Sequence, residues 1–394
     1  MLITARWLLT GATPPLADAA VLVEGETIRE IGTRRWFAKR DVADVVDLGE
    51  SILLPGLVNA HCHLEHSIAP PSGARPELPA PISFSEWVRR LQEKSAPLSP
   101  AEREKGIRAG IQELIRGGTT TLVDHRSPEA GFFETPFREY VILEVLGASA
   151  ERARTSAAEA KRRLQEMDIP CEISPHSLYA VHPSVLNDLP IRSIHLLESE
   201  EEDQFFRHGT GPLARLVKER GGEVPFPDVS PVRWLQARGA PPERPLIVHG
   251  NYLSNEEIGP LRDWEATVIH CPGSRRFFGH RLFPLEALVK ADLPIALGTD
   301  SLASNDSLNM LREMKRMKGD FPSWGGEEIL KMATSNGAAA LGMGRETGTI
   351  EVGRQADLVA IPIWNGDLDP YEALLLPDEV NFSMVGGRIL TPLS

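Results

Sequence analysis

Residues 52–63 read Ile-Leu-Leu-Pro-Gly-Leu-Val-Asn-Ala-His-Cys-His, an apolar run that ends in two histidines. A continuous apolar run of this kind is typical of a strand that is buried on both faces. Residues two apart in a strand point the same way, so His61 and His63 face one side while Cys62 faces the other. The run therefore predicts a buried strand over Ile52–Asn59 that presents two imidazoles beyond its C-terminal end.

Seven further short apolar runs follow along the chain, and helix-compatible stretches separate them. The eight predicted strands are Ile52–Asn59, Thr120–Val123, Val141–Leu146, Cys171–Ser174, Arg192–Leu196, Leu246–Val248, Thr267–Ile269 and Ile295–Gly298. Helices are expected over Ala101–Arg116, Ala150–Glu166 and Leu308–Met317. Strands that alternate with helices form a parallel sheet through right-handed crossovers, and eight such units fit a closed (β/α)8 barrel.

The two ends of the chain show a different pattern from the middle. A hairpin is expected around Gly25, and strands are expected over Thr349-Ile350, Leu358–Ile361 and Asn381–Val385. We therefore predict an α/β protein with a TIM barrel over residues 54–345. Residues 1–53 and 346–394 are expected to form a small β-sandwich domain built from both termini.

The composition excludes several classes of protein. The chain has 394 residues, of which 42% are hydrophobic and 25% charged, as in an ordinary globular protein. Its net charge is −13 and it has no basic block, so we expect no nucleic-acid partner. Three cysteines cannot form a disulfide framework. No window approaches the ~20 apolar residues of a membrane helix, and Pro14, Pro15 and Asp18 interrupt the apolar N-terminal stretch, so we expect a cytoplasmic protein without a membrane partner.

Polar residues follow several of the predicted strands at the point where each one ends. His195, His249 and Asp300 occupy such positions, in addition to His61 and His63. The His-x-His pair alone also fits a structural role. However, buried unpaired imidazoles and carboxylates are costly, and a shared cation offsets that cost. Because the C-terminal strand ends of such a barrel form its active site, we expect a zinc or iron(II) centre there.

Five segments of the chain occur in the order found in the amidohydrolase superfamily. They most resemble its aminohydrolase and chlorohydrolase branch, which includes guanine, cytosine and S-adenosylhomocysteine deaminases. The resemblance covers nearly the whole chain, and its segments are Leu54-Pro55-Gly56-Leu57-Val58-Asn59-Ala60-His61-Cys62-His63-Leu64, His195-Leu196-Leu197-Glu198, Val248-His249-Gly250, His270-Cys271-Pro272 and Leu297-Gly298-Thr299-Asp300.

The resemblance implies one divalent metal ion, held by His61, His63, His195 and Asp300. Zinc is favoured over iron(II). Binuclear relatives carry a bridging lysine on strand four, whereas Cys171–His176 contains none, which favours one metal over two.

The resemblance also implies the catalytic groups of a hydrolytic deaminase. Glu198 stands in the position of the proton-shuttling glutamate; the alternative is a solvated acidic face, because four acidic residues follow it. His249 resembles a histidine that helps to deprotonate the attacking water, and Asp300 is expected to pass a proton to the departing ammonia. The implied reaction releases ammonia from an amino-substituted nitrogen heterocycle.

Further residues are candidates for contact with the substrate. His176 resembles a strand-four histidine that touches substrate in relatives. Glu86 occupies a region where nucleoside-acting relatives place a glutamate, but an exposed position on a helix fits it equally well. Either His125 or Arg126 could face the pocket after the second strand, and the sequence leaves both options open.

Arg275 and Arg276 follow the seventh strand together with two phenylalanines, in what we expect to be a loop. A guanidinium group forks a carboxylate well, so these residues suggest an adenine-type substrate with an acidic group, such as an aminodeoxyfutalosine-like nucleoside. The alternative is a surface loop with both side chains in water.

Two rival functions remain open at this stage. One is hydrolysis of another C–N bond or of a C–Cl bond on a related heterocycle; the other is a non-catalytic binding scaffold. The expected partner is a small heterocyclic substrate, and the resemblance suggests a homodimer. The segments Ser67–Ile82 and Ser199–Arg244 are expected to shape the substrate pocket.

Overall fold

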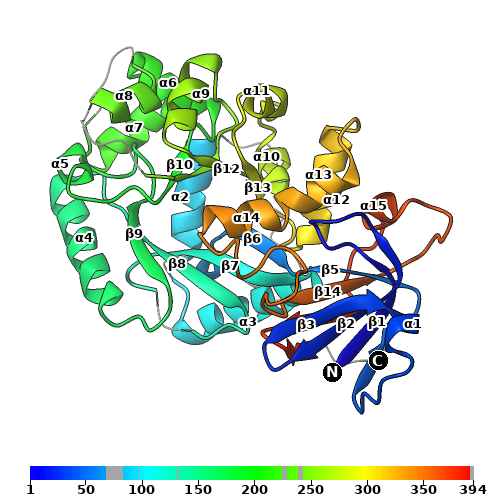
Figure 1. Ribbon diagram of the computed structural model, residues 1–394. Helices are drawn as coiled ribbons and strands as arrows, with labels where there is room; N and C mark the ends of the chain where they lie inside the picture. Colours follow the sequence, from blue (N-terminus) through cyan, green and yellow to red (C-terminus); the bar gives the residue numbers. More distant parts are fainter. Residues whose placement is uncertain (68–82, 96, 131–132, 224–228, 238–242, 391–394) are drawn as a thin grey trace.

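The computed structural model describes residues 1–67, 83–95, 97–130, 133–223, 229–237 and 243–390 (Figure 1). Eight short parallel strands form two four-stranded sheets at its centre. The first sheet contains β6 (Leu57–Cys62), β7 (Thr119–Arg126), β8 (Arg138–Val145) and β9 (Cys171–Pro175). The second contains β10 (Ser193–Leu196), β11 (Leu246–His249), β12 (Thr267–His270) and β13 (Ile295–Leu297). All eight lie where short apolar runs predict strands.

Single parallel bridges connect the two sheets at both edges. Ser177 pairs with His195 between the ends of β9 and β10, and Cys62 pairs with Asp300 between the ends of β6 and β13. These bridges lie at the C-terminal ends of the strands. They bring the His61-Cys62-His63 segment, His195 and Asp300 to the same end of the two sheets.

The prediction of a single strand over Ile52–Asn59 is wrong, because the run divides at Gly56. Residues Ser51–Pro55 form β5, which belongs to a different sheet, and β6 begins at Leu57. Gly56 lies so close to Thr120 that a Cβ atom there would be 2.0 Å from its Oγ1. A glycine is required at this point because the chain passes directly against β7 as it changes sheets.

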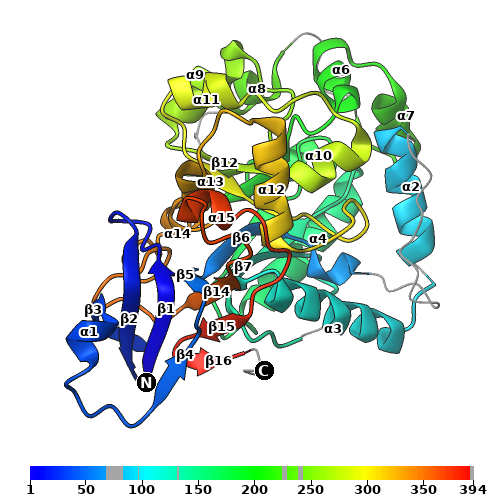
Figure 2. The same ribbon diagram turned by 90° about the vertical axis from the view of Figure 1, so that its right-hand side faces the viewer.

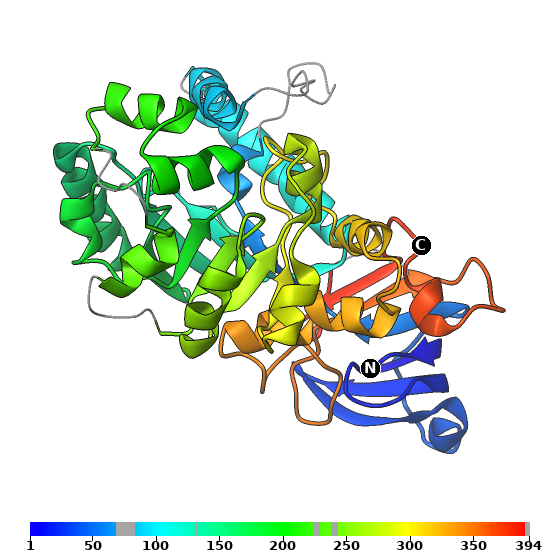
Figure 3. The ribbon, with the colours of Figure 1, turned by 90° about the horizontal axis from the view of Figure 1, so that it is seen from above.

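Both ends of the chain contribute to one eight-stranded mixed sheet. Its order is β16-β15-β14-β5-β1-β2-β3, with β4 paired to β1. The strands are β1 (Leu2–Leu8), β2 (Leu16–Glu24), β3 (Thr27–Thr33), β4 (Val45–Asp47), β5, β14 (Leu358–Pro362), β15 (Phe382–Val385) and β16 (Arg388–Ile389). Figures 2 and 3 show the N-terminal strands in blue beside the C-terminal strands in red. The predicted hairpin around Gly25 is confirmed by the antiparallel pair β2–β3.

This terminal sheet has an apolar core of its own, in which Ile3 and Val21 pack with Leu358 and Phe382. The strands predicted over Leu358–Ile361 and Asn381–Val385 are present as β14 and β15. Thr349-Ile350 is not a strand, although the Ile350 amide donates to the carbonyl of Thr10 at 2.9 Å. A second sheet packed on the first as a sandwich stays a prediction.

The described helices surround the parallel strands on the outside (Figures 1 and 3), except for the first helix, which packs against β2 and β3 of the terminal sheet. They are α1 (Arg34–Phe37), the 3₁₀ helix Leu64–His66, α2 (Phe84–Ser95), α3 (Pro100–Arg116), α4 (Ala150–Leu164), α5 (Pro183–Leu186), α6 (Glu200–His208), α7 (Pro212–Glu219), α8 (Pro231–Ala237), α9 (Asn255–Asp263), α10 (Pro272–Phe278), α11 (Leu285–Lys290), α12 (Met310–Asp320), α13 (Gly326–Met332), α14 (Ser335–Ala340) and α15 (Pro370–Ala373). The three predicted helices are present as α3, α4 and α12.

Local sequence explains where several of these helices begin. The α3 helix starts at a capping box, in which the side chain of Ser99 accepts from the Glu102 amide and Glu102 accepts from the Ser99 amide. The hydroxyl of Ser149 caps α4, and that of Ser199 caps α6 directly after the segment that carries Glu198. In the described ranges, no helix is long and apolar enough to cross a bilayer.

Candidate metal and catalytic site

Three histidines from two strand ends meet at the centre of the fold. His61 lies on β6, His63 directly follows that strand, and His195 lies on β10; all three are buried. The Nε2 atoms of His63 and His195 are 3.1 Å apart. One nitrogen from each of the three rings lies within 4.8 Å of the others, so the structure brings these three histidines together.

Glu198, His249 and Asp300 form a second cluster beside the first. The Nε2 atom of His249 lies 3.6 Å from Oε1 of Glu198 and 4.0 Å from Oδ2 of Asp300. Asp300 also approaches the histidine cluster, since its Oδ1 atom is 3.8 Å from Nε2 of His61. His249 and Asp300 both have left-handed backbones, with φ of 69° and 59°, which turn their side chains at the strand ends.

Burial and mutual charge shift the pKa values of this cluster strongly. Burial lowers the pKa of His61 to about 3 and that of His249 to about 4. Burial raises the pKa of Glu198 well above its ordinary value, and the charges of Asp300 and Glu202 raise it further. Burial alone raises the pKa of Asp300, but His61 and His249 outweigh that effect and bring it below its ordinary range. At neutral pH the imidazoles of His61 and His249 are therefore neutral and Asp300 is ionised, while Glu198 holds a proton more readily than an ordinary glutamate.

The residues present fit a divalent metal ion. The Nε2 atom of His61 is buried and has no hydrogen-bond partner among the described residues. Such an atom is costly unless something binds it, and neutral imidazoles with one carboxylate are the donors that zinc and iron(II) accept. Three of the four predicted metal ligands, His61, His63 and His195, therefore lie together as one candidate group, and Asp300 approaches that group at His61.

Glu144 is a member of the site that the sequence analysis did not identify. It lies on β8 and is buried, and its Oε2 atom is 2.9 Å from Nδ1 of His176 and 3.7 Å from Nδ1 of His63. Its Oε1 atom is 3.5 Å from Nδ1 of His195. Burial alone raises the pKa of Glu144, but His176 and His63 outweigh it and bring it to about 2. Its available signal was a single carboxylate within the apolar run of residues 141–146.

His125 and Arg126 face opposite sides of β7. The Nδ1 atom of His125 lies 3.1 Å from that of His61, and its Nε2 atom is 2.7 Å from the Ser193 hydroxyl. Arg126 instead binds the carboxylates of Asp124 and Glu139. Neither of the two residues left open above lines the catalytic cleft: His125 contacts His61, and Arg126 lies in a separate buried ion-pair network.

A cleft with a volume of about 270 Å³ opens onto both clusters. His63, His195, His249, Glu198 and Asp300 line it, and so does His176. Phe84 and Trp87 of α2 lie on its wall. The cleft therefore combines three of the four predicted metal ligands (all except His61), the predicted proton-transfer groups and two aromatic rings that suit a flat heterocycle.

Three residues predicted to contact substrate lie elsewhere. Glu86 is partly exposed on α2, where it pairs with Arg90 at 2.9 Å, and it does not line the cleft. The expected loop after the seventh strand is the helix α10, and Asp320 binds both Arg275 at 2.7 Å and Arg276 at 2.8 Å. Neither guanidinium group lines the cleft. An internal carboxylate thus holds the two arginines that we expected to hold an acidic substrate.

A family comparison agrees with this arrangement. The model of the amidohydrolase family matches residues 52–390, from the β5 strand to the end of the terminal sheet. The chain belongs to the amidohydrolase family. The matched region includes all the histidines and carboxylates described above.

This amidohydrolase is similar to several proteins of known name. It is 28% identical over 414 aligned residues to the 5-methylthioadenosine/S-adenosylhomocysteine deaminase of Pyrococcus abyssi, which covers 98% of this chain and 90% of the relative. Its fold matches the structure of Helicobacter pylori aminofutalosine deaminase in complex with methylthio-coformycin, with a TM-score of 0.85, 24% identity and coverage of 99% and 100%. It also matches an adenosine deaminase from Xanthomonas campestris with bound zinc, with a TM-score of 0.77, 24% identity and coverage of 98% and 92%.

Proposed function

We propose that this amidohydrolase is a metal-dependent hydrolytic deaminase that acts on an amino-substituted purine nucleoside. The observation that carries the proposal is the Glu198–His249–Asp300 cluster, which lines one cleft with His63 and His195 and lies beside His61. The relatives named above are deaminases, and the names of two of them refer to adenosine or its derivatives.

We assign one divalent metal ion to His61, His63, His195 and Asp300. Zinc is the preferred ion, because a zinc-containing relative shares the fold and neutral imidazoles suit it. A bound metal ion lowers the pKa of water and so supplies a nucleophile at neutral pH. Ser274 donates to Oδ2 of Asp300 at 2.7 Å and so orients the carboxylate.

The proton-transfer steps follow from the protonation states of the neighbouring residues. The water oxygen bonds to the carbon that carries the exocyclic amine, while protonated Glu198 gives its proton to the adjacent ring nitrogen. His249, which is neutral at pH 7, accepts a proton from the water. Asp300 then accepts the proton of the resulting hydroxyl and passes it to the amine, so that the carbonyl forms, the C–N bond breaks and ammonia leaves. The proton on His249 returns to Glu198, whose Oε1 atom is 3.6 Å away. We assign substrate contact to His176, which follows β9 directly and lines the cleft.

We also infer the domain organisation from the strand pattern. The two parallel sheets close into a (β/α)8 barrel over residues 54–345, for which the bridges at both edges are the support. Residues 1–53 and 346–394 form the composite β domain.

The first test is ammonia release by metal-replete protein. The panel contains adenosine, 5′-methylthioadenosine, S-adenosylhomocysteine, guanine, cytosine and a chlorinated triazine. Turnover of an adenine nucleoside supports the proposal. Chloride release without ammonia release, or opening of a ring, contradicts it and supports a different hydrolytic reaction.

Glu198→Gln tests the assigned proton donor. Loss of a general acid typically lowers the rate about 10²–10⁴-fold, so kcat is expected to fall by that factor while one metal ion per chain is retained. Glu200→Gln, on the exposed face of the adjoining helix, is the matched control and keeps its activity. A Glu198→Gln enzyme with near-normal kcat overturns the role.

A further inference from the structure

The proposed proton donor Glu198 lies on a short buried segment between β10 and α6, and the backbone of this segment is strained. Leu197, directly before it, has a left-handed backbone with φ of 50°, a conformation that residues with a side chain rarely adopt. Such a conformation persists only where the surrounding structure holds it in place. The groups that contact the backbone of Glu198 therefore decide where its side chain points.

Glu202 holds the amide of Glu198. It lies in the first turn of α6 and is fully buried, and its Oε2 atom accepts a hydrogen bond from the Glu198 amide at 2.9 Å. The amide of Glu202 donates to the Ser199 hydroxyl at 3.2 Å, so the helix cap fixes the place of the side chain. Burial raises the pKa of Glu202 to about 7, although the hydrogen bond from the Glu198 amide lowers it. The carboxyl group of one acidic residue thus supports the backbone of another.

Asn251 holds the carbonyl group of Glu198. It is buried, and its Nδ2 atom donates to the Glu198 carbonyl at 3.0 Å. It lies shortly after His249, where the chain leaves β11. The amide of Tyr252 donates to the carbonyl of Leu197 at 2.9 Å and supports the same segment. The backbone of the proposed proton donor is therefore bonded to the segment that carries His249.

Stability alone does not explain either side chain. Among the residues that the structure describes, Oε1 of Glu202 and Oδ1 of Asn251 are both buried without a hydrogen-bond partner. A buried polar atom of this kind is costly, and an apolar side chain of similar volume avoids the cost. Each polar group is better accounted for by the hydrogen bond that it makes to the backbone of Glu198.

We propose that Glu202 and Asn251 form a backbone clamp, which holds the amide and the carbonyl of Glu198 and so directs its carboxyl group into the catalytic cleft. The inference rests on the proposed deaminase function. Glu198 lines the cleft, whereas neither Glu202 nor Asn251 does, so the two act through Glu198 and are positioning residues. Because Asn251 belongs to the segment of His249, the backbone clamp also maintains the 3.6 Å separation of Glu198 Oε1 from His249 Nε2.

The first test compares substitutions in the metal-replete enzyme. Glu202→Met and Asn251→Leu remove the hydrogen bonds but keep most of the side-chain volume, whereas Glu202→Gln keeps an oxygen that can accept from the Glu198 amide. With the adenine nucleoside that the wild type deaminates fastest, kcat is expected to fall about 10–100-fold in the first two variants, because their proton donor is misplaced. KM and the bound metal are expected to change little. Glu202→Gln is expected to restore most of the rate, which a loss of packing does not explain.

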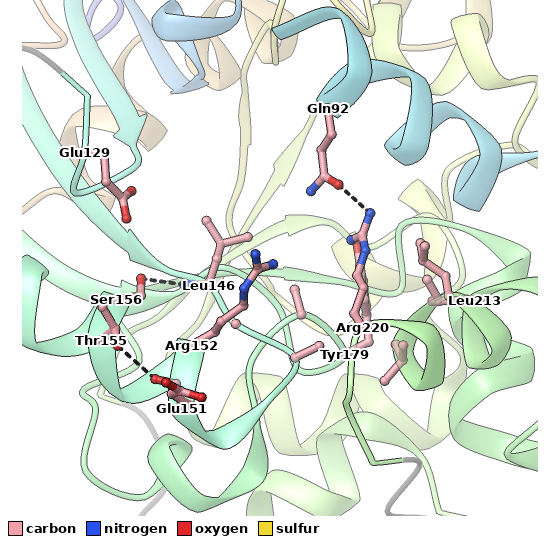
Figure 4. A pocket seen from close by; sticks show the side chains of 15 residues that line it. Gln92, Glu129, Leu146, Glu151, Arg152, Thr155, Ser156, Tyr179, Leu213 and Arg220 are labelled. Atoms are coloured by element: carbon pink, nitrogen blue, oxygen red, sulfur yellow. Dashed lines mark hydrogen bonds between the residues drawn. The ribbon is translucent and has the colours of Figure 1, made fainter. Parts of the chain in front are cut away.

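Ser156→Ala is the matched control. The Ser156 hydroxyl accepts from the Leu146 amide at 3.1 Å just beyond β8, as Figure 4 shows. This substitution removes the same kind of contact, a side-chain acceptor for a backbone amide after a strand, without touching Glu198. Its kcat is expected to stay near the wild-type value. A fall as large as that of Glu202→Met would show that the loss of rate is not specific to the backbone clamp and would overturn the proposal.

Amide hydrogen exchange tests the backbone clamp without any substrate. The Glu198 amide is expected to exchange at least about tenfold faster in Glu202→Met than in the wild type, because its acceptor is gone, and to stay protected in Glu202→Gln. Unchanged exchange in Glu202→Met, or faster exchange with an unchanged kcat, overturns the proposal. If ammonia is released and the exchange is unchanged, the deaminase proposal stands and the backbone clamp fails. If the exchange changes as expected and the wild type releases no ammonia from any amino heterocycle, the backbone clamp stands and the deaminase proposal fails.

Discussion

Glu144 illustrates how one residue can organise several others. Its two oxygens face the Nδ1 atoms of three imidazoles, and the proposed metal ligands His63 and His195 are among them. A carboxylate behind a metal-binding histidine fixes the orientation of the ring and increases the basicity of its other nitrogen. The charge on a strand that is otherwise apolar is thus explained by its position behind the ligands.

Replacing Glu144 with Gln is expected to weaken metal binding by about 10–100-fold, because the amide keeps the volume but loses the charge. Competition with a chelator of known affinity measures this change. Glu172→Gln, on the adjacent β9 strand and facing outwards towards Arg192, is the control. Unchanged metal affinity in Glu144→Gln would show that the imidazoles are oriented without it.

The sequence allowed us to identify the histidines and acidic residues at the strand ends. This was possible because the C-terminal ends of parallel strands lie together at one end of the fold. The sequence did not allow us to identify Glu144 or Arg220 as members of the cleft. Glu144 lies within a strand, and the alternation of faces becomes clear only when the ends of β8 are known. Arg220 ends a short helix in the long segment between β10 and β11, and only the packing of α7 near Tyr179 brings it to the cleft. The Arg275–Arg276 expectation missed Asp320, which is more than forty residues away.

At the scale of elements, Gly298, the residue that follows β13, lies directly against β6 at His61. A Cβ atom at this position would lie 2.8 Å from the Cβ atom of His61 and 2.9 Å from its carbonyl oxygen. Because Gly298 has no side chain, the ends of β6 and β13 can lie close enough for His61 and Asp300 to approach each other.

Gly298→Ala is therefore expected to destabilise the fold by about 1–3 kcal/mol and to weaken metal binding, since β6 must move at His61. Urea denaturation and metal titration measure the two effects. Gly259→Ala is the control, because nothing lies within 4 Å of the added methyl group and it lies inside α9. A Gly298→Ala protein as stable as the wild type contradicts the close approach.

The β4 strand ends at Asp47, whose carboxylate accepts from Arg34 at 2.8 Å and from the Gly49 amide at 3.0 Å. The hydrogen bond from Arg34, followed by that from Gly49, lowers the pKa of Asp47 to about 2. A lowered folded-state pKa stabilises the fold above the unfolded value near 4, and this contribution is lost as the pH falls towards 2. The carboxylate is exposed, so the contribution is at most about 1 kcal/mol.

Asp47→Asn is expected to lower the free energy of unfolding slightly at pH 7 and to match the wild type near pH 2–3. Urea midpoints measured between pH 7 and pH 2.5 give the comparison. Asp44→Asn, which removes an exposed carboxylate just before the same strand, is the control. If the difference in urea midpoint between Asp47→Asn and the wild type stays constant over this pH range, the Asp47 carboxylate is not its source.

Some element boundaries could be predicted and others depended on contacts that the sequence does not display. The eight parallel strands follow from their apolar runs. The division at Gly56 was missed because both halves are equally apolar, and only the pairing partners distinguish them: β1 and β14 for β5, and β7 for β6. The α10 helix was missed because Pro272 and Gly273 at its start suggest a loop. In the structure, the Gly273 amide in the first turn of this helix donates a hydrogen bond to the carboxylate of Glu313.

At the scale of the whole molecule, the proposed metal ion joins the two parallel sheets, because its ligands come from β6, β10 and the end of β13. A ligand that binds only the folded state stabilises it by RT ln(1 + [L]/Kd), or about 4 kcal/mol at a thousandfold excess over Kd. Removal of the metal with a chelator is expected to lower Tm by roughly 5–10 °C, and its return to restore it. Glu198→Gln, which keeps the ligands, is expected to show the same shift. If metal analysis confirms that the ion has been removed and Tm does not change, the proposal that the metal ion connects the two sheets is wrong.

The position of β5 between β1 and β14 has a consequence for synthesis of the chain on the ribosome. β1, β2, β3 and β5 emerge first and can pair with one another, but β14 begins about 300 residues after β5 ends. At ~5–20 residues per second, the free edge of β5 waits roughly 15–60 s for its partner. During that interval a nascent polypeptide exposes unpaired backbone amides to other chains. Its yield in cells is therefore expected to depend on translation speed and on chaperones that shield this edge.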